Sequence, residues 1–422
     1  MAPELKVSGF YKMDIDERLL IIKEKAGLSD LDLQTLKCGL DLKTANRMVE
    51  NVIGMIQLPV GIAMNFRINS RDYLIPMAIE EPSVVAAASH AAKLSLPEGF
   101  TASSTRPVMR GQMQVIGVRD LEGGKRKVDE NKKYLVEKAN CFADMLPSIG
   151  GGVLDVTARI IGPPEKGMLV VEFFVDCRDA MGANTINTIV EGMAPEVEQL
   201  VGGKSLLKII SNLATERLAK SKVVYRKEVI GGEEVVGRII DAYKFAYYDP
   251  YRATTHNKGI MNGITAVTLA LGNDTRAIEA GAHSYAALSG KYLPLSRWSK
   301  DDDGNLVGEL ELPLAYGIVG GATRTHPVAQ VCLKIIGVKT ASELAEVACS
   351  VGLAQNFAAL RALATEGIQR GHMELHARNI AILAGATGDQ IDKIAEILAK
   401  ERNVKVTRAK EVLESLSKKQ TE

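Results

Sequence analysis

The sequence lacks paired cysteines, a surplus of charge and long uninterrupted apolar runs. Its five cysteines are scattered and none forms a CxxC pair, which argues against a disulfide framework or a cysteine zinc site. Lys plus Arg (52) nearly balances Asp plus Glu (51), so no strong field attracts nucleic acid or an anionic membrane. No apolar run approaches the roughly 18–20 residues of a bilayer span, and the charged start lacks the apolar core of a signal peptide. We expect a cytoplasmic protein without nucleic-acid or membrane partners.

The nucleotide-binding fingerprint GxGxxG is also absent, so an ordinary Rossmann fold has no support. With 422 residues, of which 46% are hydrophobic, the chain is too long for one ordinary core. We therefore expect two or three packed domains.

The segment 107–211 has its own order of elements. Apolar stretches predict strands at 113–118, 153–161, 168–176 and 206–210, and amphipathic stretches predict helices at 128–146 and 185–200. This β-α-β-β-α-β order is typical of a split βαβ, ferredoxin-like domain. We predict that it is inserted into a larger domain.

The remaining chain predicts a large mixed α/β domain made of residues 1–106 and 212–376, so the fold class is α+β. Residues 15–55 predict helices, with helical periodicity continuing over 41–53. Short apolar stretches predict strands at 58–66 and 73–78, and Pro82-Ser83 begins an alanine-rich helix at 84–94. Residues 377–422 predict amphipathic helices after a hinge at 385–388.

A polar cluster lies in the segment 249–262, which contains Arg252, His256, Lys258 and Asn262. If a helix begins at Asn257, Lys258 and Asn262 share one face. A lysine held beside Asp274 stays charged and could stabilise an oxyanion. The alternative is a structural salt bridge.

Two adjacent carboxylates, Glu80 and Glu81, precede the helix at 84–94. They could complement the helix dipole. Alternatively, one of them is desolvated, protonated and serves as a general acid.

The segment Asp179-Ala-Met-Gly-Ala-Asn184 joins a predicted strand to a predicted helix. Gly182 would allow close approach of the backbone to a ligand, and the helix N-terminus offers N–H groups to a pyrophosphate. A plain turn with Asn184 as N-cap explains the pattern equally well.

His372 and His376 lie four residues apart. Glu374 does not occupy the position that the HExxH zinc motif requires, so an acid–base histidine is favoured over a zinc ligand.

Together these segments resemble the hydroxymethylglutaryl-coenzyme A (HMG-CoA) reductase family, in particular its soluble second class from bacteria and archaea. Seven motifs carry the resemblance in the order of the family: Glu50-Asn-Val-Ile-Gly54, Glu80-Glu-Pro-Ser-Val-Val-Ala-Ala-Ala-Ser89, Asp179-Ala-Met-Gly-Ala-Asn184, His256-Asn-Lys-Gly-Ile-Met-Asn262, Gly272-Asn-Asp-Thr-Arg276, Val319-Gly-Gly-Ala-Thr323 and Gly371-His372. Two positions depart from the pattern, because His90 replaces a tyrosine and Arg324 a lysine.

The resemblance implies a role for each candidate residue. Catalysis would fall to Lys258, Asp274, the acid Glu81 and the thiolate-protonating His372. The 3-hydroxy-3-methylglutaryl group would be held by Ser83, Arg252 and Asn262. The dinucleotide would be held by Asp179, Met181, Gly182, Ala183 and Asn184.

The resemblance further implies two hydride transfers that interconvert HMG-CoA with mevalonate and free coenzyme A, and no metal. It implies a mobile flap at 377–422 and a homodimer, or a multiple of dimers, with active sites between subunits. Members that use NADH carry an acidic residue near 140–146, where Ala143 aligns and Asp144 is adjacent, so NADH is favoured over NADPH.

Other functions remain open from the residues alone. The enzyme could reduce another 3-hydroxyacyl-CoA thioester. A zinc hydrolase would use His372 and His376. A non-catalytic CoA-binding protein would not need Lys258, Asp274, Glu81 and His372 together.

Overall fold

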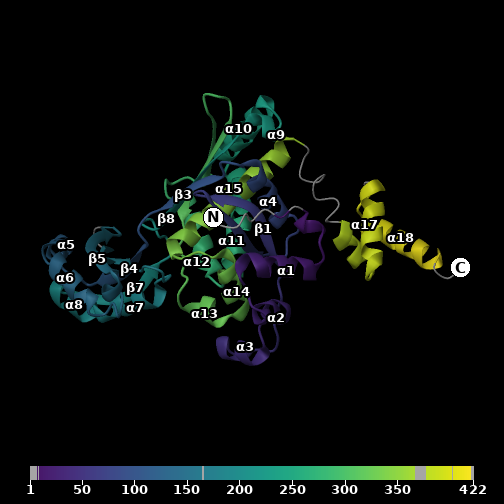
Figure 1. Cartoon of the computed structure of the whole chain (residues 1–422). Helices are drawn as coiled ribbons and strands as arrows, with labels where there is room; N and C mark the ends of the chain where they lie inside the picture. The colour runs from purple at the N-terminus through teal and green to yellow at the C-terminus, as the bar shows by residue number, and fades with distance from the viewer. Residues whose placement is uncertain (1–6, 8, 164–165, 366–376, 402, 420–422) are drawn as a thin grey trace.

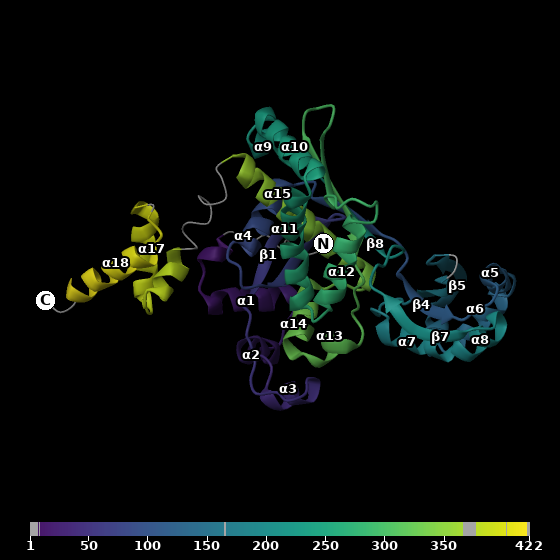
Figure 2. The ribbon, with the colours of Figure 1, turned by 180° about the vertical axis from the view of Figure 1, so that it is seen from behind.

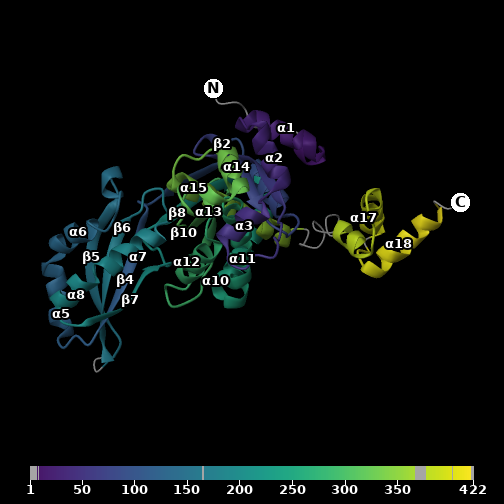
Figure 3. The same ribbon diagram turned by 90° about the horizontal axis from the view of Figure 1, so that it is seen from below.

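The computed structural model describes residues 7, 9–163, 166–365, 377–401 and 403–419, which form three groups of elements (Figure 1). A six-stranded unit occupies the centre, a four-stranded unit lies on one side and the C-terminal helices lie on the other. The view from behind and the view from below keep this arrangement (Figures 2 and 3).

The six-stranded unit is built on a mixed sheet with the strand order β2-β1-β3-β8-β10-β9. Only the β1–β3 pairing is parallel. The strands are β1 (Val60–Ile68), β2 (Arg71–Ala78), β3 (Phe100–Ser104), β8 (Leu218–Tyr225), β9 (Ser296–Lys300) and β10 (Leu306–Pro313).

Eleven α-helices surround this sheet in the described part of the chain. They are α1 (Ile15–Ala26), α2 (Asp30–Cys38), α3 (Leu42–Met48), α4 (Val84–Leu94), α9 (Lys227–Ile230), α10 (Glu233–Tyr248), α11 (Pro250–Ala270), α12 (Thr275–Ala286), α13 (Gly321–Thr325), α14 (Pro327–Ile336) and α15 (Ala341–Ala364). A short 3₁₀ turn, Phe10–Lys12, precedes them. The predicted strands at 58–66 and 73–78 and the helix at 84–94 are confirmed.

Helix α15 runs through the core and contacts α4, α11 and strands β3, β8 and β10. It is long enough and apolar enough to cross a membrane, with a mean hydropathy of 1.3 over its most apolar window. The expectation that no segment reaches this threshold is therefore wrong. The helix is mostly buried inside the unit, so its apolar composition is explained by core packing.

One predicted helix limit in this unit differs from the structure. Helix α3 ends at Met48, whereas the periodicity extended to Ile53. Residues 51–59 are irregular, and Ile53 and Ile56 are 102% and 94% exposed. Apolar residues there do not face this chain's core.

The four-stranded unit has the strand order β5-β6-β4-β7, with antiparallel pairing throughout. Its strands are β4 (Val108–Ile116), β5 (Gly152–Ile161), β6 (Met168–Asp176) and β7 (Lys204–Ser211). This arrangement is the one expected for a split βαβ fold. The two predicted helices are each divided, giving α5 (Leu121–Glu130), α6 (Lys132–Asn140), α7 (Ala183–Gly192) and α8 (Ala194–Val201), and a 3₁₀ turn, Pro147–Ile149, precedes β5.

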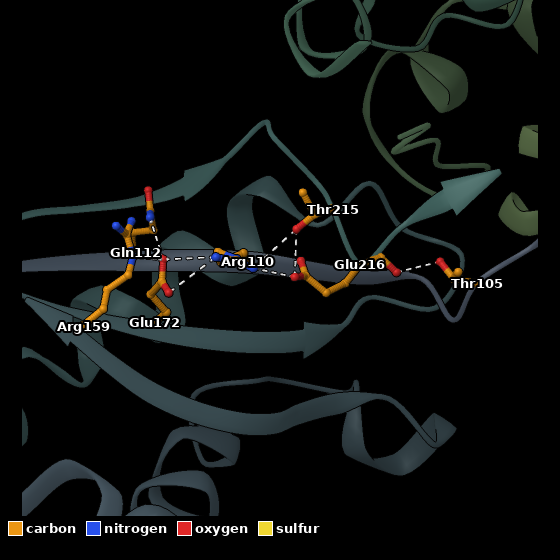
Figure 4. Close-up of polar contacts among 7 residues, drawn as sticks. All are labelled: Thr105, Arg110, Gln112, Arg159, Glu172, Thr215 and Glu216. Atoms are coloured by element: carbon orange, nitrogen blue, oxygen red, sulfur yellow. Dashed lines mark hydrogen bonds and ion pairs between the residues drawn. The ribbon is translucent and has the colours of Figure 1, made fainter. Parts of the chain in front are cut away.

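Two chain segments, residues 105–107 and 212–217, connect the two units and form a neck between them. Thr105 donates its backbone N–H to the carbonyl of Leu218 (2.9 Å) and its hydroxyl to the carbonyl of Glu216 (2.6 Å). Arg110 on β4 forms ion pairs with Glu216 and with Glu172 on β6, so a polar network extends from the neck across the open face of the small sheet (Figure 4).

The C-terminal helices comprise residues 377–383, α17 (Asp389–Glu401) and α18 (Val406–Lys419). Their buried apolar residues form a separate cluster whose described members all lie between Ala377 and Leu416. This group therefore has a small core of its own.

Candidate active site

A cavity of about 870 Å³ lies in the six-stranded unit, lined by α4, α11 and α15. Five predicted site residues line it, namely Glu81, Ser83, Arg252, Lys258 and Asn262. The first two immediately precede α4, and the other three lie on α11. Asp249 starts α11 by accepting the backbone N–H of Arg252 (2.6 Å), and Pro250 occupies the first turn. The helix therefore begins well before Asn257, yet Lys258 and Asn262 still share one face.

Three of these side chains meet at one carboxylate oxygen. The Nζ atom of Lys258 lies 2.8 Å from Oε2 of Glu81, and Nδ2 of Asn262 donates to the same oxygen at 3.4 Å. The side chains of Lys258 and Glu81 are 59% and 38% exposed. An acid, a cation and an amide thus converge on a surface that a ligand can reach.

Ser83 has two features that point to a ligand. Its φ of 76° lies in the left-handed region, which is strained for a residue with a side chain. Its hydroxyl is buried without a hydrogen-bond partner in the described structure and does not cap α4. A buried hydroxyl without a partner is costly, so a substrate atom is its natural partner.

Sequence reasoning missed Gln355 on α15. This residue is 6% exposed and lines the cavity, and its Oε1 atom is buried without a partner in the described structure. It lies among alanines and apolar residues of a long core helix. Only a buried amide in that setting could have drawn attention to it.

The cavity carries more positive than negative charge. Arg252, Lys258 and Arg361 line it, against the carboxylate of Glu81. Burial lowers the pKa of Arg252, because the guanidinium loses water. Such a site favours an anionic ligand.

Farther from this polar group, His90 on α4 and Arg361 on α15 line the same cavity. Burial, followed by the charges of Arg361 and Lys93, lowers the pKa of His90. Much of the wall around the polar groups is apolar: Ala86, Ala87, Ala91, Leu94, Ile230, Val235, Ala358, Ala362 and Leu363. A ligand with a polar head and an apolar arm matches this lining.

His256 does not join the polar cluster of the cavity. It lies on α11 but is buried in the core, where its Nε2 atom lies 2.7 Å from the hydroxyl of Ser296. Burial lowers its pKa to about 3. His256 is therefore a neutral core residue that helps to fix α11.

Asp274 lies away from Lys258 within one chain. It caps α12 by accepting the backbone N–H groups of Arg276 (3.0 Å) and Ala277 (3.1 Å), and it pairs with the Arg276 side chain at 3.1 Å. From Lys258 to the end of α11 at Ala270 the helix extends about 18 Å, at about 1.5 Å per residue. The structure thus does not bring these two predicted partners together in a single subunit.

The Asp179–Asn184 loop joins β6 to α7 at the contact between the two units. Gly182, with a φ of 104°, is the residue before the helix, so Asn184 lies in the first turn and is not its N-cap. A Cβ atom at Gly182 would collide with Sγ of Cys177. The loop therefore requires glycine and leaves the backbone of α7 open at its N-terminus.

The carboxylate of Asp179 already has a structural partner. Its Oδ1 atom accepts the backbone N–H of Ala341 at the start of α15 (2.8 Å), and its carbonyl accepts the N–H of Ile318 (2.9 Å). This residue fastens the loop to the six-stranded unit. Met181 and Ala183 are partly buried, and Asn184 is exposed.

Asp144 is exposed in the turn between α6 and β5 and has a φ of 49°. Ala143 beside it is buried. Farther along the same connection, a Cβ at Gly151 would meet the side chain of Arg178, the residue before Asp179. The two loops are therefore neighbours.

His372 and His376 lie outside the described residues. Among the residues described, no group of three or more His, Cys, Asp or Glu side chains has a metal-binding arrangement.

Comparison with known proteins identifies the family. Residues 14–377 match the sequence model of hydroxymethylglutaryl-coenzyme A reductase. The 3-hydroxy-3-methylglutaryl-coenzyme A reductase of Archaeoglobus fulgidus is 56% identical over 413 residues, which cover 97% of this chain and 94% of that protein. A probable reductase of the same name from Borreliella burgdorferi is 40% identical over 338 residues, covering 79% of this chain and 77% of that protein.

A solved structure leads to the same family. The class II 3-hydroxy-3-methylglutaryl-CoA reductase from Streptococcus pneumoniae, bound to NADPH in open conformations, superposes with a TM-score of 0.81 at 39% identity. The match covers 96% of this chain and all of that one (100%). The resemblance seen in the seven motifs is thereby confirmed, and the chain belongs to the hydroxymethylglutaryl-coenzyme A reductase family.

Proposed function

We propose that this chain reduces HMG-CoA to mevalonate and free coenzyme A with a nicotinamide cofactor. The observation that carries the proposal is the convergence of Lys258 and Asn262 on Glu81 in one cavity. A structural salt bridge needs neither the amide nor the cavity beside it. The family membership supplies the reaction that this group would serve.

The cavity suits the carboxylate end of the substrate. Arg252 and Lys258 offer two positive charges, and the unpaired hydroxyl of Ser83 offers a hydrogen bond. Charge-assisted hydrogen bonds of this kind are stronger than neutral ones and hold a carboxylate in one orientation. The apolar wall near His90 would receive the arm of the thioester.

The residues divide the chemistry among them. As the thioester carbonyl is reduced, the ammonium of Lys258 stabilises the oxyanion. When the hemithioacetal collapses, His372 protonates the departing coenzyme A thiolate, which prevents its return. In the reduction of mevaldehyde, Glu81 or Lys258 supplies the proton to the alkoxide.

The cofactor would be held by the Asp179–Asn184 loop, where each reduced dinucleotide would supply one hydride, so two dinucleotides would bind in succession. Gly182 and the open N-terminus of α7 fit a pyrophosphate. Asp144 could accept a hydrogen bond from the ribose 2′-hydroxyl and would repel a 2′-phosphate, which favours NADH. The relative from S. pneumoniae is bound to NADPH, so the preference of this chain needs a direct measurement.

The separation of Asp274 from Lys258 supports a dimer with shared active sites. Asp274 can act beside Lys258 only if a second subunit supplies it. Large apolar side chains are exposed on the surface of the six-stranded unit, including Ile53, Ile56, Tyr248 and Tyr251. A homodimer, or a multiple of dimers, would cover them.

The three groups of elements support the division into domains 1–106 with 212–376, 107–211 and 377–422. Their apolar cores are largely separate. The C-terminal group would act as a flap that closes over the site, excludes water and brings His372 to the thiolate.

The test is the absorbance of the reduced nicotinamide with HMG-CoA as substrate. We expect oxidation of two cofactors per thioester and no effect of a chelator. Faster turnover of another 3-hydroxyacyl-CoA would assign the site to that thioester instead. Inhibition by the chelator would favour the zinc hydrolase or another metal enzyme.

A further inference from the structure

Arg217 occupies a position at the neck that the proposed reaction does not yet use. It follows the linker from β7 and directly precedes β8, so it stands where the chain re-enters the six-stranded unit. The residue is 5% exposed. A buried arginine at a junction between two units requires an explanation, since arginine is rarely buried unless it is paired.

The guanidinium of Arg217 donates hydrogen bonds to backbone carbonyls of the Asp179–Asn184 loop, the proposed cofactor loop. Nη1 donates to the carbonyl oxygens of Ala180 (3.1 Å) and Met181 (3.2 Å), and Nη2 donates to the carbonyl oxygen of Tyr316. The carbonyl of Arg217 itself accepts the N–H of Leu314 (3.1 Å). Through its side chain and its backbone carbonyl, Arg217 thus joins the loop of the four-stranded unit to residues 314–316 of the six-stranded unit.

These bonds orient the loop. A trans peptide directs its carbonyl and its N–H to opposite sides. Because the carbonyl of Met181 is turned toward Arg217, the N–H of Gly182 is turned away from it, at the start of α7. The free N–H groups at this helix end are the ones that an anionic pyrophosphate would meet.

The charge of Arg217 is compensated only in part. In the described structure no carboxylate forms an ion pair with it, and its hydrogen-bond partners are neutral carbonyls. Burial lowers its pKa, while Cys177, Asp176 and Asp179 nearby act in the opposite direction. A desolvated cation behind the loop attracts an anion more strongly than a hydrated one does.

We propose that Arg217 is a positioning residue for the dinucleotide cofactor: it fixes the Asp179–Asn184 loop against the six-stranded unit and places a buried positive charge behind it. This proposal rests on the proposed function, because it assumes that the loop binds the cofactor. Arg217 contacts neither the cavity at Lys258 nor any predicted HMG-CoA ligand. Loss of Arg217 should therefore weaken binding of the dinucleotide and leave binding of HMG-CoA unchanged.

The neck offers a matched control in Arg110. This arginine is partly buried and pairs with Glu216 and Glu172 (Figure 4). Its guanidinium also lies over the ring of Phe174, 4.9 Å from the ring centroid. It makes no contact with the cofactor loop among the contacts of the described residues. Replacing it disturbs the neck without removing support from that loop.

The experiment compares Arg217→Met, Arg217→Lys and Arg110→Met with the wild type. Dissociation constants are measured for NADH and NADPH by the fluorescence of the reduced nicotinamide and for HMG-CoA by calorimetry, alongside KM, kcat and Tm. We expect Arg217→Met to weaken binding of both dinucleotides by about 10- to 100-fold, the effect of losing charge-assisted hydrogen bonds. Binding of HMG-CoA should stay within about twofold in every variant.

Arg217→Lys keeps the charge and the buried stem but cannot reach three carbonyls together, so it should recover part of the affinity. If Arg217→Met does not fold, this variant alone should still weaken dinucleotide binding while sparing HMG-CoA. Arg110→Met should lower Tm and leave dinucleotide affinity unchanged. Unchanged dinucleotide affinity in both Arg217 variants, or equal losses for dinucleotide and HMG-CoA, would overturn the proposal. A wild type that binds neither dinucleotide would instead overturn the proposed function.

Discussion

The ammonium of Lys258 lies 2.8 Å from Oε2 of Glu81, although the two residues are 177 positions apart in the chain. Glu81 lies just before α4 and Lys258 lies in the middle of α11, so the packing of these two helices brings the pair together. The proposed oxyanion stabiliser and the proposed acid are therefore direct neighbours. Each charge affects the other, and variants of both should be studied together.

Replacing Lys258 with alanine should nearly abolish turnover while the protein stays folded and binds HMG-CoA. Loss of one preorganised oxyanion stabiliser typically lowers the rate about 10²- to 10³-fold. Steady-state kinetics and calorimetry measure the two effects. Lys244→Ala, which removes a surface ion pair with Asp241, is the control. If Lys258→Ala retained more than a few tenths of the activity, Lys258 would be only an ion-pair partner.

The cofactor preference should depend on Asp144. Its carboxylate is exposed in a loop that adjoins the loop of Asp179, and a negative charge there disfavours a 2′-phosphate. Asp144→Ala should raise kcat/KM for NADPH relative to NADH. Asp129→Ala, an exposed carboxylate on α5, should not change the ratio. An unchanged ratio in Asp144→Ala would place the determinant elsewhere.

A chain that ends just before Gly385 should remain folded but lose thioester reduction. The truncation removes α17 and α18, whose apolar residues pack within their own cluster and not in the core of the six-stranded unit. Circular dichroism and Tm report folding, and the HMG-CoA assay reports closure of the site. Precipitation of the truncated chain would show that these helices are needed to cover the main core.

Lys258 and Asp274 should complement each other between subunits. Mixed dimers of Lys258→Ala and Asp274→Ala would contain one site with both defects and one intact site. After random exchange of subunits, about one quarter of the wild-type activity should return, because half of the dimers are mixed and half of their sites are intact. If both residues act in the same subunit, mixing restores nothing.

Loss of the imidazole in His372→Ala should separate the two half-reactions. Reduction of HMG-CoA expels a thiolate that needs a proton, whereas free mevaldehyde has no thiolate to expel. We expect the variant to lose most HMG-CoA reduction and to keep most mevaldehyde reduction. Lys258→Ala should lose both, since an oxyanion forms in each.

Two other roles of His372 predict different results. A zinc ligand would be required in both reactions, and a chelator would reproduce the defect. A packed core histidine would lower both activities together with Tm. A parallel loss of both activities would contradict the assigned role.

The sequence by itself determined the local features of this protein. Short apolar stretches placed β1 and β2, and Pro82 before an alanine-rich stretch placed α4. The four-residue spacing put Lys258 and Asn262 on one helix face. Gly182 marked a sharp turn before α7. Each of these features depends on neighbouring residues, so a linear pattern is sufficient to reveal it. The motifs also identified the family, because seven of them occur in one order.

Only the tertiary structure decided which distant residues meet. It brought Glu81 to Lys258, left Asp274 at the far end of α11, buried the amide of Gln355 beside the cavity and placed Arg217 behind the cofactor loop. It also buried His256 beside Ser296, outside the polar cluster, although that residue lies two positions from Lys258. The physical reason is that contacts between elements depend on how helices and sheets pack, and neither spacing nor composition encodes that packing locally.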